Sequence, residues 1–313
     1  MSIITRANFV DLYLGEDFAD VKDLEGSGHR RVPAPPAWAE ALNALRQRCR
    51  EHFREHQDPE FSLIEDGIVL RVTLIRDSFS NDVFVIRRSD AQIRPFDLLG
   101  LPESVASALL DDKVRGLVLF SGEMKSGKTS SAASLISARL QACGGTALAI
   151  EDPSETNLNG LHGEGRCIQM QVSLRSGGYE EALVRALRTG ADMLLIGEIR
   201  DGPTAALTVQ AAINGHFVAA TLHAGGPAQA VERLLALASP ALNNVNAPAV
   251  LAQGLTAVIG QALLSQGERK VLKVRSLLLT GHDAAGIREK IRNGQIAQLK
   301  HDIDAQSKRE RLA

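Results

Sequence analysis

The chain has 313 residues, of which 44% are hydrophobic, 23% charged and 4% aromatic, and its formal net charge is -2 at pH 7. This composition is typical of a globular protein of about two domains and excludes a disordered chain. The balanced charge and the few aromatic residues argue against nucleic acid as a partner. Three widely spaced cysteines indicate neither a disulfide framework nor a zinc module, and we expect free thiols in a cytoplasmic protein.

Residues 1–112 are predicted to form a small α+β domain. Residues 1 to about 31 are mixed and charged, and we expect a small packing arm or a partly mobile segment there. Apolar residues at three- and four-residue spacing predict a helix over 37–56, and alternating apolar residues between turn signals predict paired strands over 61–88. No basic and apolar leader is expected, because acidic residues follow the first residues almost at once.

Residues 113–313 are predicted to form a larger α/β domain. Strands are expected at 116–121, 146–150, 192–196 and 216–222, and helices at 130–142, 179–188, 204–213 and 228–237. This alternation predicts a mostly parallel sheet with helices on both faces. The uncharged stretch 234–267 contains prolines, asparagines and glutamines, so we expect buried helices joined by a loop and not a membrane span.

The first strand of this domain leads into a candidate phosphate-binding loop. Residues 122–129 read Gly-Glu-Met-Lys-Ser-Gly-Lys-Thr, which fits G-x-x-x-x-G-K-[ST] between a strand and a helix. Glycines in such a loop let backbone N–H groups close around phosphates at the positive end of a helix. Lys128 would contact the β and γ phosphates, and the Thr129 hydroxyl would hold Mg²⁺. Nucleotide contacts are expected from Gly122, Lys125, Ser126, Gly127, Lys128, Thr129 and Ser130.

Polar residues follow the other three predicted strands, and ligands of an open parallel sheet bind at this edge. Glu151 and Asp152 follow the second strand, Glu198 follows the third and His223 the fourth. Glu198 is the candidate for orienting the attacking water near a γ phosphate, and Glu151 is the second carboxylate. The structural alternatives are an acid at a helix N-terminus for Glu198, a turn residue for Glu151 and a hydrogen-bonded strand end for His223.

Together these segments resemble the secretion ATPase superfamily, particularly type IV pilus retraction ATPases of the PilT type. The matching segments are 122–129 for the Walker A loop, 149–153 for the Asp box, 195–201 for Walker B and 214–223 for the His box. Residues 286–294 are similar to a segment associated with retraction-type members. The resemblance runs from about Phe61 to Leu299, and it implies a RecA-like P-loop NTPase domain preceded by a small PAS-like α+β domain.

The resemblance also implies roles for single residues. Glu198 matches the family's catalytic glutamate, Glu151 would assist at the metal or the water, and His223 would sense the γ phosphate. Arg71 and Arg87 align with strand arginines that reach the nucleotide in the family, so they are candidate transition-state cations. For each arginine the alternative is an exposed strand residue.

The implied function is a Mg²⁺-dependent ATPase that powers pilus retraction or disassembly through ATP-driven domain rotation in a hexameric ring. Such a protein is cytoplasmic and docks on a platform protein at the inner face of the cytoplasmic membrane, with no nucleic acid as partner. Two alternatives stay open: an ATPase of a conjugative or type IVB secretion system, and a nucleotide-binding structural module with little hydrolysis.

The chain departs from the family pattern within the phosphate loop. The usual form is G-P-T-G-S-G-K-[ST], whereas Glu123, Met124 and Lys125 occupy its second to fourth positions. A lysine at position 125 either adds positive charge near the phosphates or changes the path of the loop. The effect of these residues on nucleotide affinity and turnover is therefore open.

Overall fold

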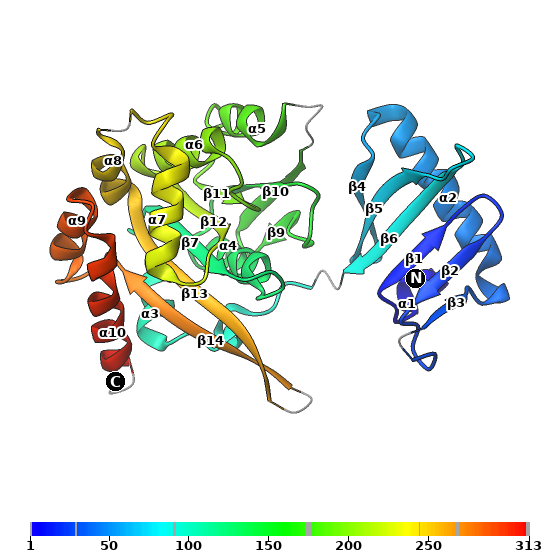
Figure 1. Ribbon diagram of the computed structural model, residues 1–313, viewed down its shortest axis with the longest axis horizontal. Coiled ribbons are helices and arrows are strands. Elements are labelled where there is room, and N and C mark those ends of the chain that lie inside the picture. Colours follow the sequence, from blue (N-terminus) through cyan, green and yellow to red (C-terminus); the bar gives the residue numbers. More distant parts are fainter. Residues whose placement is uncertain are drawn as a thin grey trace. The chain divides into compact units, whose positions relative to one another are not determined.

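The computed structural model describes residues 2–28, 30–89, 92–172, 177–243, 245–266 and 269–310. The chain divides into two compact units (Figure 1). The first comprises residues 1–92, 152–157 and 171–176, and the second comprises residues 93–151, 158–170 and 177–313. Each unit has its own sheet and is described by itself.

The first unit is a six-stranded antiparallel sheet with a helix packed against it. The strand order is β3-β2-β1-β6-β5-β4. Helix α2 (Ala39–His56) buries Leu42, Leu45 and Cys49 against inward-facing strand residues. The other elements are α1 (Ile3–Arg6), β1 (Asp11–Leu14), β2 (Ala19–Lys22), β3 (Arg31–Pro33), η1 (Pro36–Trp38), β4 (Glu60–Glu65), β5 (Ile68–Arg76) and β6 (Asp82–Ser89).

The predicted helix over 37–56 and the paired strands over 61–88 are confirmed. The segment expected to be a packing arm forms β1, β2 and β3 instead, and β1 pairs with β6 near the middle of the sheet. Its strand signal is weak because the strands are short. In β1 only Leu12 and Leu14 point into the core, which is too brief an alternation to recognise.

The second unit contains an eight-stranded sheet in the order β14-β13-β7-β12-β11-β8-β10-β9. The five strands from β13 to β8 in this order are parallel to one another, and β14 and β9 run antiparallel to their neighbours. The strands are β7 (Gly116–Gly122), β8 (Thr146–Glu151), β9 (Gly160–His162), β10 (Gly165–Gln171), β11 (Met193–Ile196), β12 (Phe217–His223), β13 (Leu255–Gln266) and β14 (Arg269–Leu278).

Helices cover both faces of this sheet (Figure 1). Val118 and Phe120 of β7 lie in one core with α4, whereas Leu117 and Leu119 point to the opposite face, where α6 contacts the same strand. The prediction of an α/β fold with a mostly parallel sheet is confirmed. The helices are η2 (Phe96–Leu99), α3 (Glu103–Leu110), α4 (Lys128–Cys143), α5 (Gly178–Ala186), α6 (Gly202–Ile213), α7 (Pro227–Ala238), α8 (Ala247–Gly254), α9 (Ala284–Arg292), η4 (Ile296–Gln298) and α10 (Leu299–Glu310).

Residues 255–266 were expected to belong to buried helices, and this prediction was wrong because they form β13. The strand lies between β7 and β14, and Leu255, Val258 and Ile259 are all fully buried. A strand that is buried on both faces lacks the alternation of apolar and polar residues that distinguishes a strand from a helix. Within the described ranges, no helix combines the length and apolar character needed to cross a bilayer.

Arg139 anchors the far end of α4, the helix that follows the phosphate loop. Its side chain is 1% exposed and its Nη1 donates hydrogen bonds to the carbonyl oxygens of Leu109 (2.6 Å) and Asp111 (2.9 Å). The guanidinium carbon also lies 3.9 Å from the ring centroid of Phe217 on β12. These contacts tie the C-terminal half of α4 to the end of α3 and to the sheet.

The outer strand β14 is covered by α10 at one position. Gln306 is 8% exposed, and its Oε1 accepts a hydrogen bond from the N–H of Leu278 (2.8 Å) while its Nε2 donates to the carbonyl oxygen of Leu278 (2.9 Å). The side-chain amide therefore makes the two hydrogen bonds that a neighbouring strand would make with this residue.

Candidate active site

The parallel strands bring four predicted features to one edge of the second unit's sheet. Strand β7 leads into the loop at 122–127, and β12 ends at His223, which lies opposite Gly122 in the register. Strand β11 pairs with β12 and leads to Glu198, and β8 pairs with β11 and ends at Glu151. The carboxyl edge of the sheet thus carries the loop, two acids and a histidine, as the sequence predicts.

The phosphate loop has the tight backbone that its sequence pattern predicts. Gly127 has a φ of 87°, and α4 begins directly after it at Lys128 without a capping side chain. A Cβ atom at Gly122 would lie 2.5 Å from Ser126 Oγ and 2.3 Å from a backbone oxygen of β13, so only glycine fits. The uncapped N–H groups at the positive end of α4 therefore lie beside a narrow loop, which is a suitable place for an anion.

Two hydrogen-bond donors, the Lys128 ammonium group and the Ser126 hydroxyl, are buried at the loop where phosphates would bind. The Lys128 side chain is buried, and its Nζ donates to the carbonyl oxygen of Glu123 (2.8 Å), which places the ammonium group at the loop. The Ser126 hydroxyl is also buried, and among the described residues it has no hydrogen-bond partner. A buried ammonium group and a buried hydroxyl are suitable donors for phosphate oxygens. Thr129 and Ser130 follow in the first turn of α4 and are partly exposed.

Lys125, where the family pattern has glycine, adopts a backbone conformation that favours glycine. Its φ is 62°, in the left-handed region, and its side chain is exposed. A residue with a Cβ atom costs roughly 1–2 kcal/mol in this region. The loop therefore keeps a conformation suited to glycine, and the lysine adds local backbone strain and a positive charge.

We expect Lys125→Gly to give a more stable protein than Lys125→Ala, by about 1 kcal/mol in the free energy of unfolding. Both variants remove the same charge, so their difference reports the relief of backbone strain less the extra entropy that glycine gives the unfolded chain. Urea unfolding without nucleotide measures it. An alanine variant as stable as the glycine variant would show that residue 125 is not strained in solution.

The carboxylate group of Glu198 contacts the side chains of His223 and Arg200. Its Oε1 lies 3.1 Å from Nε2 of His223, and Nε of Arg200 donates to its Oε2 at 2.6 Å. The Thr221 hydroxyl donates to the carbonyl oxygen of Gly197 (2.5 Å), which fixes the backbone just before Glu198. The carboxylate is 19% exposed, so it is oriented by its partners and still open to solvent. This combination is suited to binding and orienting a water molecule.

Glu151 is the more deeply buried acid, with 1% exposure. Nε2 of Gln169 donates to its Oε2. A Cβ atom at Gly197 would lie 3.2 Å from the Glu151 Cγ, so the glycine allows this side chain to lie beside the strand that leads to Glu198. Burial, and then the charge of Glu151, raises the pKa of the Cys167 thiol to about 12, so this thiol is protonated at neutral pH.

The predicted ligands of Mg²⁺ are Thr129 and Glu151. Hydroxyl and carboxylate oxygens are ligands that Mg²⁺ accepts, together with phosphate oxygens and water. In the part of the chain that the structure describes, no three His, Cys, Asp or Glu side chains are grouped to hold a metal ion by themselves. Phosphate oxygens and water would therefore supply the remaining ligands, and the role of these two residues stays a prediction.

Arg71 and Arg87, the predicted transition-state cations, belong to the first unit and lie opposite each other on β5 and β6. Nη1 of Arg71 donates to Oε1 of Glu155 (2.8 Å), and Nε of Arg87 donates to Oδ1 of the buried Asp11 (2.8 Å). The hydrogen bonds to Asp11 raise the pKa of Arg87. Both arginines thus have partners within their own unit, and their role toward the nucleotide stays a prediction.

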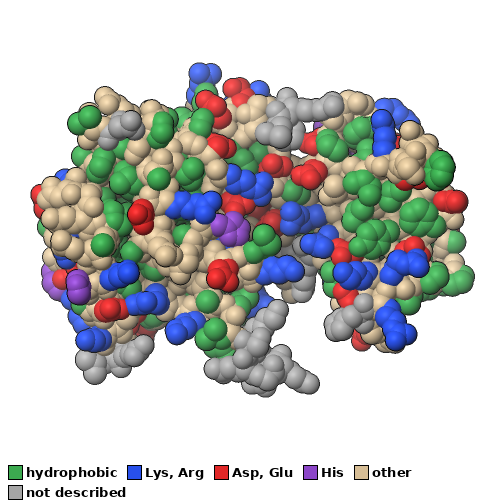
Figure 2. All heavy atoms as spheres, viewed as in Figure 1, with side chains coloured by type: hydrophobic (Ala, Val, Ile, Leu, Met, Phe, Trp, Pro, Cys, Tyr) green, Lys and Arg blue, Asp and Glu red, His purple; other side chains and the backbone are tan. Residues whose placement is uncertain are grey.

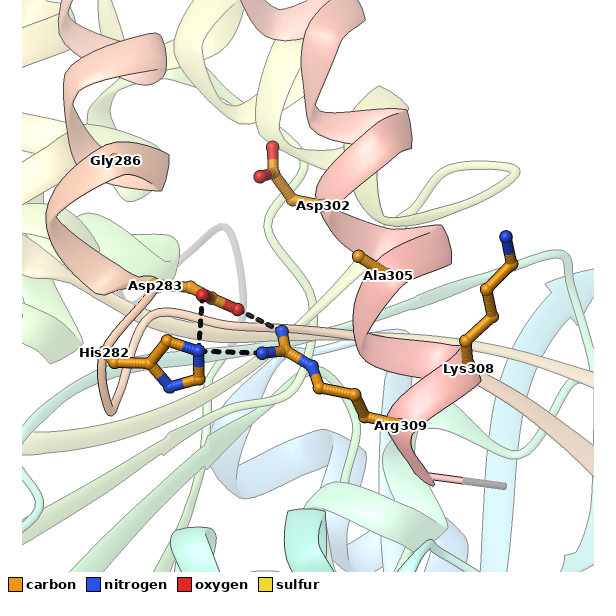
Figure 3. Close-up of a pocket in the computed structure, with 7 residues that line it drawn as sticks. All are labelled: His282, Asp283, Gly286, Asp302, Ala305, Lys308 and Arg309. Atoms are coloured by element: carbon orange, nitrogen blue, oxygen red, sulfur yellow. Dashed lines mark hydrogen bonds and ion pairs between the residues drawn. The ribbon is translucent and has the colours of Figure 1, made fainter. Parts of the chain in front are cut away.

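A hollow of about 560 Å³ in the C-terminal part lies beside α9 and α10 (Figure 3). Arg309 of α10 donates to Asp283 and lies 2.9 Å from Nε2 of His282, as the dashed lines in Figure 3 show. Asp302, which also lines the hollow, accepts hydrogen bonds from Lys290 of α9 (2.8 Å). These ion pairs join α9 to α10, and no predicted site residue lines this hollow.

The parallel sheet and the loop after β7 define a P-loop nucleotide-binding protein. The sequence pattern of the family described as type II/IV secretion system protein matches residues 54–297, and the chain belongs to this family. It is 33% identical over 267 residues to the type IV pilus ATPase PilU of Pseudomonas aeruginosa, an alignment that covers 83% of this chain and 66% of PilU. It is 29% identical over 298 residues to the type IV pilus retraction ATPase PilT of the same organism, covering 92% of this chain and 83% of PilT.

Solved structures agree with this assignment. The crystal structure of the pilus retraction motor PilT with bound ADP matches with a TM-score of 0.76 at 25% identity, over 96% of this chain and 86% of that one. The Legionella pneumophila ATPase DotB shares the fold, with a TM-score of 0.71 at 18% identity over 97% of this chain and 88% of its own. The predicted family and fold are confirmed, and the names of these relatives agree with the predicted ATPase activity.

Three residues of the site were not predicted as site residues. Arg200 bonds to Glu198, Gln169 bonds to Glu151, and Gln261 of β13 donates to a carbonyl oxygen of the phosphate loop. Arg200 lies within the Walker B segment, so the sequence pattern itself could have identified it as a site residue. Gln169 and Gln261 are 18 and 135 residues from their partners, so no local pattern connects them to the site.

Proposed function

We propose that this chain is a Mg²⁺-dependent ATPase motor that powers the retraction or disassembly of a type IV pilus. The observation that carries the proposal is the shared edge of β7, β12 and β11, where the phosphate loop lies and Glu198 is held by His223 and Arg200. Membership of the type II/IV secretion system family and the similarity to PilU and PilT support it.

In the proposed reaction, the residues of the second unit act at the carboxyl edge of its sheet. The loop N–H groups and Lys128 bind the phosphates and neutralise their charge. Thr129 and Glu151 hold Mg²⁺, which supplies further positive charge at the phosphates when bound. Glu198 orients the attacking water, and His223, which bonds to Glu198, senses the γ phosphate. Arg71 and Arg87 serve as cations for the transition state.

We propose that the motor is a cytoplasmic hexamer docked on a platform protein at the inner face of the cytoplasmic membrane, without nucleic acid. Figure 2 shows hydrophobic side chains gathered on the visible face of the first unit. Among the exposed residues of this unit, Ile75 is 48% and Phe79 84% exposed. Exposed apolar groups of this kind support a protein interface. Light scattering with and without ADP and Mg²⁺ measures the number of subunits.

The biochemical test is steady-state phosphate release from ATP by the purified protein. We expect hydrolysis that requires Mg²⁺ and stops when EDTA removes the metal, because the triphosphate charge is then not neutralised. ADP binding is measured by calorimetry in the same preparations. A protein that binds neither ATP nor ADP would contradict the proposal.

The cellular test is deletion of the gene in its host. A lost retraction motor leaves assembled pili on the cell surface and abolishes motility that depends on retraction. Wild-type protein should restore retraction, and Glu198→Gln should not. Unchanged pili together with lost conjugation or protein secretion would favour the alternative of a conjugative or type IVB secretion ATPase.

A nucleotide-binding module with little hydrolysis is a second candidate, and two observations favour it. Lys125 strains the phosphate loop at a position where the family pattern has glycine. Both carboxylate oxygens of Glu198 have protein partners, so a water molecule must share or displace one of them. Tight ADP binding with phosphate release no faster than from Lys128→Ala would support this candidate.

A further inference from the structure

Gln261 connects the neighbouring strand β13 to the phosphate loop. Its side chain is 5% exposed, and its Nε2 donates a hydrogen bond to the carbonyl oxygen of Ser126 at 2.8 Å. A carbonyl oxygen can only accept, so this contact also determines which end of the side-chain amide faces the loop. The amide is therefore joined to the loop backbone through its nitrogen, while its Oε1 is buried and has no hydrogen-bond partner among the described residues.

The packing of the loop glycines shows that Gln261 supports both ends of the loop. Strand β13 runs parallel to β7 with Gly260 opposite Ser121, so Gln261 lies next to the residue where the loop begins. A Cβ atom at Gly122 would lie 2.3 Å from the backbone oxygen of Gln261, and one at Gly127 would lie 3.4 Å from its Nε2. The first and the last glycine of the loop therefore both pack against this residue.

The hydrogen bond to Ser126 also determines the direction of the next N–H group. The peptide unit between Ser126 and Gly127 is planar, and in a trans peptide the C=O and N–H bonds point in opposite directions. When Gln261 binds the carbonyl oxygen on the β13 side, the N–H of Gly127 points away from β13. Without this bond, the Ser126–Gly127 peptide can rotate and direct its carbonyl oxygen toward a phosphate. The two negatively polarised groups would then repel each other.

We propose that Gln261 is a positioning residue for nucleotide binding, because it holds the Ser126–Gly127 peptide with its N–H group turned toward the phosphates. This inference rests on the proposed function, since it assumes that phosphates bind at residues 122–129. Gln261 acts through the loop backbone and touches no reacting atom. Its contribution is to the affinity for nucleoside di- and triphosphates.

The test compares Gln261→Leu with wild-type protein and with Gln306→Leu in ADP binding by calorimetry. Both glutamines are buried and donate to a backbone carbonyl oxygen, but Gln306 bonds to Leu278 and not to the loop. We expect Gln261→Leu to weaken ADP binding about tenfold and Gln306→Leu to leave it unchanged. Equal affinities for Gln261→Leu and wild type, or equal losses in both variants, would overturn the inference.

Gln261→Glu provides a second test that a general loss of packing would not mimic. A protonated carboxyl group can donate to the Ser126 oxygen, whereas a carboxylate cannot, and burial raises the pKa of such a group. Relative to wild type at the same pH, this variant should bind ADP weakly at about pH 8.5 and recover toward about pH 6. A ratio that does not change with pH would overturn the role of residue 261 as a donor. If wild-type protein itself ignores ADP, the proposed function fails instead.

Discussion

Glu198→Gln is expected to keep nucleotide binding and to lower kcat for ATP hydrolysis by at least about 10²-fold. The amide has nearly the shape of the carboxylate but no negative charge, so it cannot orient and polarise the attacking water as the carboxylate does. Nε of Arg200 and Nε2 of His223, which contact the two carboxylate oxygens, would then face a neutral group. Phosphate release at saturating ATP measures kcat, and calorimetry with ADP measures binding.

The control for this variant is Glu232→Gln on α7, which removes one negative charge from an exposed position of the same unit. We expect it to hydrolyse ATP like wild type. Unchanged turnover in Glu198→Gln would exclude Glu198 from the catalytic role and leave Glu151 as the candidate carboxylate. A loss of ADP binding in Glu198→Gln would indicate that the acid supports the phosphate loop and does not act on the water.

Lys128→Ala is expected to weaken ADP and ATP binding by about 10²-fold or more, with an at least equal loss in kcat/KM. The variant removes a buried ammonium group beside the loop, and hydrogen bonds from such a group to phosphate oxygens are among the strong ones. It also leaves the Glu123 carbonyl oxygen without the bond that it now accepts from Lys128. Calorimetry with each nucleotide measures the affinities.

Lys113→Ala provides the matched control, since Lys113 is exposed and precedes β7 in the same unit. Its net charge change equals that of Lys128→Ala, so long-range electrostatics affect both variants similarly. Nucleotide affinity that falls equally in both variants would show that total charge, and not a contact at residue 128, governs binding. A Lys128→Ala protein that binds ADP like wild type would contradict the phosphate loop itself.

The chemistry at the strand ends could be predicted from sequence because each feature follows an apolar run within a few residues. The loop at 122–129 follows β7 directly, and Glu198 and His223 are similarly close to β11 and β12. Parallel strands end at the same edge of the sheet, so residues that follow different strands in the sequence lie close together in space. The contact between His223 and Glu198 is the result of this rule.

The supporting residues could not be predicted, because their partners are distant in sequence. Gln261 contacts Ser126 only because β13 is inserted beside β7, and β13 itself was expected to be helical. Gln169 reaches Glu151 from β10, a strand that was not predicted from the sequence. A sequence motif contains residues that are close together in the sequence. These two amides instead contact residues that belong to other segments of the chain.

Gln306 affects how separate copies of the chain can associate. Because it already binds both backbone groups of Leu278, β14 cannot recruit a strand from another molecule at this position. Free backbone groups at the margin of a sheet otherwise invite fusion of two sheets, which is hard to reverse. At this position another copy can approach only through side-chain contacts, which separate more easily than a shared sheet, and the proposed motor needs separable contacts when its subunits turn in each cycle.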